Sequence, residues 1–154
     1  MATEMTLNTK VANVEGTKSF ARHLPTAARY FMGLMFFVFG LNGFLNFMPP
    51  PPPETLPADS VAFSEALVKS GYLFQLIKGT EVLVGVLLLA NRFVPLALAL
   101  IAPIVVNIVA FHAFLMPDGM VMTFIVLALE VYLAWAYRES FRGMLVMRAT
   151  PGSK

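Results

Sequence analysis

Two oppositely charged residues, Lys78 and Glu81, lie inside the apolar segment that runs from Gly71 to Phe93. A spacing of three positions brings both side chains to one face of a helix, where they can form an ion pair. Charges within a membrane-spanning helix are costly, and they are usually paired and functional. The sequence therefore predicts a buried ion pair that either stabilises helix packing or takes part in ligand or proton chemistry.

Further polar residues lie in the other apolar segments, and Asn42, Asn46 and Glu130 are among them. Counting depth at about 1.5 Å per residue puts most of these polar groups in the outer half of the predicted membrane domain. Glu81 and Glu130 come nearest the midplane. The shared depth predicts one pocket, open toward the outer side, whose candidate ligand-binding residues are Lys78, Glu81, Asn42, Asn107, His112 and Glu130.

Helical phase supports this pocket only in part, and each polar residue also has a structural interpretation. Asn42 and Asn46 share a helix face, but His112 lies about 140° around the helix from Asn107. Asparagines in membranes often bond neighbouring helices rather than ligands. His112 and Glu130 can be polar side chains satisfied by neighbours. Small residues favour close helix packing in lipid, which we expect of glycines 33, 40, 43, 79 and 85.

Several chemistries are not expected from this sequence. The chain has no cysteine, which argues against thiolate metal sites, iron–sulfur clusters and disulfide relays. The second histidine, His23, lies in the polar N-terminal segment, so bis-histidine haem ligation inside the membrane is not expected. No metal-ligand spacing, phosphate loop or nucleophile elbow occurs. The pI near 9.1 comes from dispersed basic residues, and we expect no metal site and no nucleic-acid partner.

The polar residues must be positioned by apolar helices. The chain of 154 residues is 58% hydrophobic and 13% charged, whereas soluble domains are about 45–50% apolar and about 25% charged. A helix needs roughly 20 apolar residues to cross about 30 Å of hydrocarbon. The sequence therefore predicts an all-α protein, a transmembrane four-helix bundle over residues 27–137, with spans at about 27–48, 71–90, 94–116 and 120–137.

The connections between the predicted spans differ in character. Short links at residues 91–93 and 117–119 predict antiparallel neighbours. The first link, residues 49–70, opens with a run of prolines that favours an extended strut. A short helix should follow, capped by Asp59 or Ser60. We expect that helix to lie in the interface and to cover one mouth of the bundle.

The basic residues predict an orientation in the membrane. Cytoplasmic loops carry an excess of Lys and Arg. With the polar N-terminal tail (residues 1–26) and the C-terminal tail (residues 138–154) both cytoplasmic, Lys69 is the only basic residue on the outer side of the membrane. The basic residues then on the cytoplasmic side are Lys10, Lys18, Arg22, Arg29, Arg92, Arg138, Arg142, Arg148 and Lys154.

Three segments carry a resemblance to a known family: "RYFMGLMFFVFGLNGF", "LIKGTEVLVGVLLLANRFVPLALAL" and "APIVVNIVAFHAFL". Over about residues 25–145 the chain resembles the DoxX family of small four-span membrane proteins. The resemblance implies a multi-pass protein of the bacterial cytoplasmic (inner) membrane. It also implies an association with redox complexes, because the family takes its name from subunits of quinone-linked sulfur oxidation. It assigns no catalytic role to individual residues.

Two functions follow as expectations, and neither assigns an enzymatic activity. The first is a redox-associated subunit whose pocket binds a quinone or another lipophilic small molecule. Lys78 or His112 would donate to a ligand carbonyl, and Glu81, with Glu130 behind it, would pass protons. The alternative is a non-catalytic accessory or assembly subunit packed against a larger membrane complex or a second copy of the chain. A small-solute or proton pathway is a weaker third possibility.

Overall fold

The computed structural model describes the backbone of residues 2–144 and the side chains of residues 23–144. The predicted C-terminal tail beyond residue 144, with Arg148 and Lys154, lies outside the described residues. The described part contains helices and no β-strand, which confirms the all-α class. Its elements are α1 (Ala2–Leu45), the 3-10 turn η1 (Pro53–Thr55), α2 (Ala58–Lys69), α3 (Leu73–Leu89), α4 (Val94–Phe114), the 3-10 turn η2 (Pro117–Gly119), α5 (Met120–Ala136) and α6 (Arg138–Phe141).

Three segments are long and apolar enough to cross a membrane: His23–Leu45 of α1, Val94–Phe114, and Pro117–Ala136 with α5. Helices α2 and α3 together make a fourth candidate, bent by 89° at the link between them. The helix surfaces expose many large apolar side chains, such as Phe114 and Val121. Such surfaces are stable in lipid, and the chain is a multi-pass membrane protein.

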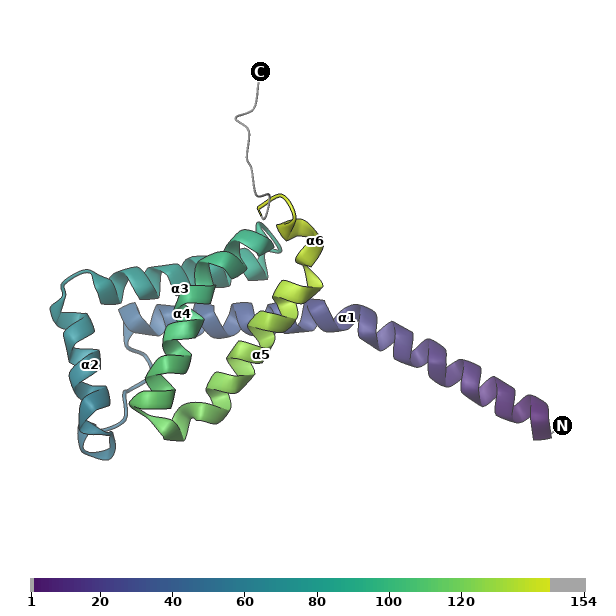
Figure 1. Ribbon diagram of the computed structural model, residues 1–154, viewed down its shortest axis with the longest axis horizontal. Coiled ribbons are helices and arrows are strands. Elements are labelled where there is room, and N and C mark those ends of the chain that lie inside the picture. The colour runs from purple at the N-terminus through teal and green to yellow at the C-terminus, as the bar shows by residue number, and fades with distance from the viewer. Residues whose placement is uncertain (1, 145–154) are drawn as a thin grey trace, which may run out of the picture.

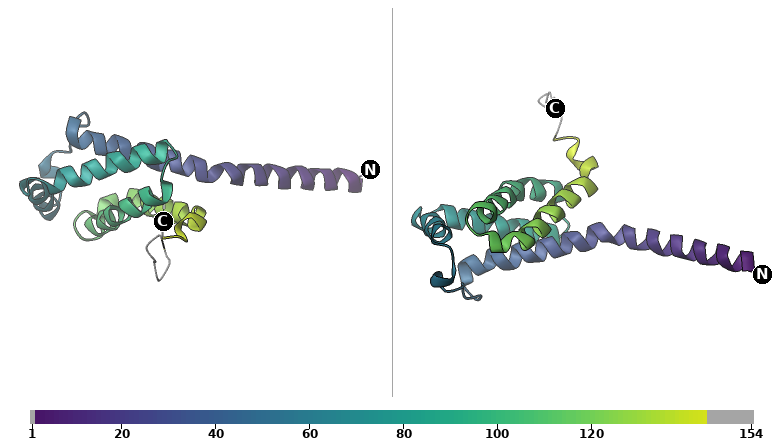
Figure 2. Two further views of the ribbon diagram at one scale, coloured as in Figure 1. Left: turned by 90° about the horizontal axis from the view of Figure 1, so that it is seen from above. Right: turned by 60° about the horizontal axis from the view of Figure 1, so that its bottom comes forward.

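Helix α1 is longer than the predicted first span. It is continuous from Ala2 to Leu45 with Pro25 inside it, and its N-terminal half projects beyond the other helices (Figures 1 and 2). Its C-terminal end comes three residues before the predicted end at residue 48. Asn46 takes a left-handed φ of +48°, which stops the helix, and its N–H donates to the Asn42 carbonyl at 2.9 Å.

Helices α1 and α3 approach closely because glycines line their contact. A Cβ at Gly85 would lie 2.6 Å from the backbone nitrogen of Phe37, and one at Gly40 would lie 2.8 Å from that of Val82. Gly33 and Gly43 also face atoms of α3. Gly79 has no such neighbour within 4 Å, so its predicted packing role is wrong.

The turn between α3 and α4 is compact because two hydrogen bonds close the end of α3. The Arg92 N–H donates to the Leu87 carbonyl at 2.9 Å and the Asn91 N–H to the Leu88 carbonyl at 3.2 Å. Asn91 adopts the left-handed φ of +54° that this helix-ending motif requires. Four residues, 90–93, thus join the two helices, one more than the predicted link at 91–93.

Helices α1, α3, α4 and α5 share one apolar core, and the helices in most extensive contact are α1 with α3 and α4 with α5. Tight packing of such side chains supplies much of the attraction between helices in lipid. Its buried apolar members are Ala28, Met32, Phe36, Val84, Leu88, Val94, Ala97, Leu98, Ile101, Val105, Val126 and Leu133.

Helix α2 lies across one end of the helix group, at the opposite end from the N-terminus (Figures 1 and 2). It follows the proline-rich link, as predicted. The predicted capping by Asp59 or Ser60 is wrong, because Pro57 occupies the N-cap position. The Ser60 hydroxyl instead donates to the Pro57 carbonyl at 2.7 Å. This end of the molecule holds the cavity described next.

Candidate functional site

A cavity of about 610 Å³ lies where α2 meets α3 and α4. Its walls are mainly aliphatic and aromatic, and the rings of Phe63 on α2 and Phe111 on α4 are in contact with centroids 5.6 Å apart. Polar groups interrupt this apolar wall at a few points. The lining residues are Phe63, Ser64, Leu67, Val68, Leu73, Phe74, Ile77, Lys78, Glu81, Pro103, Ile104, Asn107, Ile108, Phe111 and His112.

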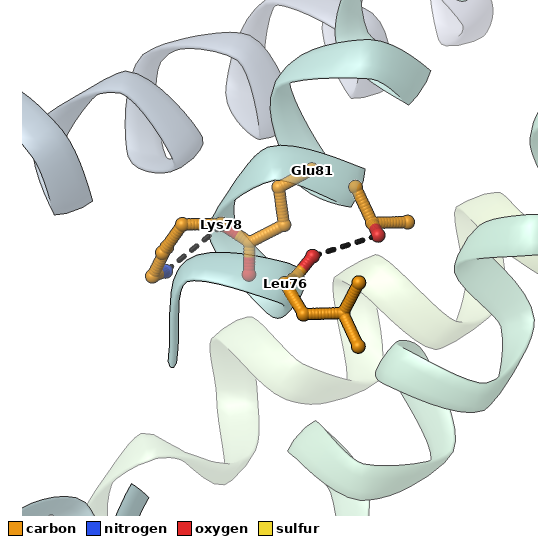
Figure 3. A network of polar contacts seen from close by, with 4 residues as sticks. Leu76, Lys78 and Glu81 are labelled. Carbon is orange, nitrogen blue, oxygen red and sulfur yellow. Dashed lines mark hydrogen bonds and ion pairs between the residues drawn. The ribbon is translucent and has the colours of Figure 1, made fainter. Parts of the chain in front are cut away.

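The ion pair predicted from the sequence is present in the cavity wall. Lys78 Nζ donates to Glu81 Oε2 at 2.9 Å (Figure 3). The Lys78 side chain is 22% exposed and that of Glu81 is 6% exposed. The aliphatic part of Lys78 lies against Gly43 of α1, where a Cβ would collide with it. An ammonium group has three N–H donors, so Lys78 keeps donors beyond the one that Glu81 accepts.

His112 also lies in the cavity wall. Its Nδ1 lies 2.9 Å from the Ile108 carbonyl. A carbonyl oxygen can only accept, so Nδ1 carries the hydrogen and Nε2 of the neutral ring is left with a lone pair. The expected donation from His112 to a ligand carbonyl therefore requires the cationic ring. Gly119 of η2 lies against the imidazole and leaves no room there for a side chain.

Asn107 adds an amide to the polar part of the lining. It lies on α4 one turn after Pro103, and both residues face the cavity. Within the described side chains its amide has no hydrogen-bond partner, so it presents both donors and an acceptor. Lys78, Glu81, Asn107 and His112 are thus brought together, as the sequence predicted.

Asn42 and Glu130 do not line this cavity, so the expectation of one pocket shared by all four spans is wrong. The Asn42 Oδ1 accepts from the Met48 N–H at 2.7 Å, which ties the loop to the end of α1. Glu130 is buried on the face of α5 that also carries Val126 and Leu133. The predicted directions of the Asn42 and Glu130 side chains were therefore wrong.

Arg29 is a buried residue whose structural role the sequence interpretation missed. It is 3% exposed, its Nη1 donates to the Leu88 carbonyl near the end of α3, and its guanidinium lies 4.4 Å from the centroid of the Tyr30 ring. A cation at a helix C-terminus interacts favourably with the helix dipole. A charged residue inside the first apolar segment could have indicated this buried role. The sequence interpretation instead counted Arg29 only among the basic residues that set the orientation in the membrane.

The fold and the cavity together define a class: a helical multi-pass membrane protein with an apolar cavity that carries an internal ion pair. Within residues 23–144, no group of three or more His, Cys, Asp or Glu side chains could hold a metal ion. Searches against family models, curated proteins and solved structures find no match to the chain.

Proposed function

We propose that this protein is a DoxX-like, redox-associated subunit of the bacterial inner membrane that binds a quinone or a similar lipophilic small molecule. In this proposal the helices α1, α3, α4 and α5 are the spans of a four-helix bundle. The observation that carries the proposal is the cavity with the Lys78–Glu81 pair in its wall. The sequence resemblance supports the redox association.

The size and chemistry of the cavity suit such a ligand. Small-molecule sites are typically about 300–1,000 Å³, mostly apolar, with a few polar groups that orient the ligand. The rings of Phe63 and Phe111 offer an apolar surface for a flat ring. The free N–H groups of Lys78 and the amide of Asn107 can donate to ligand carbonyl oxygens.

The distribution of charge supports the proposed orientation. Arg29 and Arg92 lie near the end of α3, and Arg138 and Arg142 follow the end of α5, at the opposite end of the helices from α2. With that end in the cytoplasm, both termini are cytoplasmic and the cavity opens toward the outer side. A ligand could then enter from the outer half of the bilayer.

Direct binding tests this proposal. The full-length protein in lipid nanodiscs would be titrated with a short-chain ubiquinone by isothermal calorimetry. The variant Lys78→Met/Glu81→Gln removes both charges together and so leaves no unpaired one. We expect its affinity to fall by about tenfold or more, because a charge-assisted hydrogen bond to the ligand is lost.

A matched control uses the exposed ion pair of α2. Lys69 and Glu65 form an ion pair at 3.2 Å outside the cavity lining, so Lys69→Met/Glu65→Gln should leave the affinity unchanged. Absence of binding by the unmodified protein would refute the quinone proposal. If the unmodified protein and both variants bind the quinone with equal affinity, the Lys78–Glu81 pair takes no part in binding.

The accessory-subunit alternative has its own supporting observation. The N-terminal half of α1 extends as a helix beyond the packed helices (Figure 2), which leaves a segment for contact with a larger membrane complex or a second copy. A chain lacking residues 2–20 should then lose its copurifying partner while keeping its thermal stability. Retention of the partner by the shortened chain would argue against this role for the extension.

A further inference from the structure

Glu130 is a second buried acid, away from the cavity. It is 8% exposed, and its Oε2 is fully buried without a hydrogen-bond partner within the described residues. Val126 and Leu133, one turn to either side on α5, are also buried. Thr123 is the other polar side chain on that face, but its hydroxyl donates to the Gly119 carbonyl at 3.1 Å. Glu130 therefore lies among groups that cannot stabilise a negative charge.

The charged groups on neighbouring elements make their contacts away from Glu130. Arg29 of α1 donates through Nη1 to a backbone carbonyl of α3, although its buried Nε has no hydrogen-bond partner within the described residues. Lys78 of α3 pairs with Glu81. His112 of α4 bonds the Ile108 carbonyl, and Asp118 of η2 is itself acidic. Among the side chains of residues 23–144, no cation lies within 4.0 Å of Glu130. An isolated carboxylate in such surroundings is strongly disfavoured, and the group takes up a proton instead.

We infer that Glu130 is a proton-binding site of the membrane domain, separate from the cavity and occupied by a proton at rest. The neutral acid is the form that an apolar interior tolerates, and release of its proton requires water or a base to reach α5. This inference does not rest on the quinone proposal, because Glu130 does not line the cavity. It differs from the expected relay, in which Glu130 stood directly behind Glu81.

A protonated acid in an apolar site has a characteristic reactivity. Its O–H adds across one C=N bond of a hydrophobic carbodiimide to give an O-acylisourea, which rearranges to a stable N-acylurea. The whole reagent stays on the protein, no group leaves, and no oxidant or reductant is needed. An ion-paired carboxylate lacks the proton that starts this addition, so Glu81 should be much less reactive than Glu130.

The first measurement locates the proton by labelling. The full-length protein in detergent at neutral pH would be treated with dicyclohexylcarbodiimide, and its peptides analysed by mass spectrometry. We expect at least about tenfold more adduct on Glu130 than on Glu81, because the Lys78 pair must be broken before Glu81 can hold a proton. Glu130→Gln should remove the adduct. In Lys78→Met, Glu81 should become labelled, which checks that the reagent reaches buried acids.

The second measurement does not depend on access of the reagent. Infrared spectroscopy at neutral pH should detect the C=O stretch of a protonated carboxylic acid in the unmodified protein. That band should disappear in Glu130→Gln and persist in Lys78→Met/Glu81→Gln. Loss of the band in Glu130→Gln supports the inference. A spectrum unchanged by Glu130→Gln would overturn it, whatever the labelling.

Discussion

Removing either partner of the Lys78–Glu81 pair should destabilise the protein, and removing Lys78 should cost more than removing Glu81. Lys78→Met leaves the Glu81 carboxylate, whose side chain is 6% exposed, without its cation. Breaking a buried pair in this way costs about 3–5 kcal/mol. Glu81→Gln leaves Lys78, whose side chain is 22% exposed and long enough to reach the surface, so we expect a smaller loss of about 1–3 kcal/mol. The double variant should lose about 1–2 kcal/mol, since no charge is left unpaired.

The free energies of unfolding would be measured by reversible denaturation with SDS in mixed micelles. A double-mutant cycle then gives the interaction energy between the two side chains directly. The exposed pair Lys69–Glu65, with side chains 78% and 59% exposed, is a matched control. Lys69→Met should change stability by about 0–0.5 kcal/mol. If the Lys78 and Glu81 losses add within error, or if Lys78→Met costs no more than Lys69→Met, the buried-pair reasoning is wrong.

Three further predictions concern packing, the end of α3 and orientation. Gly85→Leu should strongly lower the midpoint of thermal unfolding, because the leucine side chain would collide with the backbone of α1, whereas Gly79→Leu should change the midpoint little. Equal effects of the two substitutions would contradict the close contact between α1 and α3. Arg29→Met should cost about 1–3 kcal/mol in the SDS assay, because the α3 carbonyl loses its charged donor, and an unchanged stability would show that this contact contributes nothing. In intact spheroplasts, Thr55→Cys should react with an impermeant maleimide and Ser140→Cys should not, and the reverse labelling would invert the proposed orientation.

The helices could be predicted from the sequence because apolar segments of membrane length are separated by turn residues. Their ends depend on local backbone conformations that composition does not specify. Asn46 ends α1 and Asn91 ends α3 in left-handed conformations, which asparagine adopts more readily than most residues. The end of α3 was predicted to within one residue, whereas Asn46 was placed inside the first span. The extension of α1 through Pro25 was also not predicted, because polar composition does not exclude a helix.

The site could be predicted only where sequence spacing fixes direction. Residues three apart on a helix must share a face, so Lys78 and Glu81 could be paired from the sequence. Asn42 and Glu130 could not be placed correctly from the sequence, because their positions depend on how α1 and α5 are rotated about their own axes. In lipid both the core face and the lipid face of a helix are apolar, so the hydrophobic pattern gives little information about that rotation.

The position of Arg29 has a consequence for the order in which the chain assembles. In the proposed orientation α1 enters the bilayer before α3 has been synthesised, so the carbonyl that Arg29 contacts does not yet exist. Its charge must then stay hydrated at the cytoplasmic surface and can be buried only when the end of α3 arrives. One residue would thus fix the direction of insertion early and join two helices late. In Arg29→Cys chains, this cysteine should react with a cytoplasmic maleimide when the chain is truncated before α3, and become protected at full length.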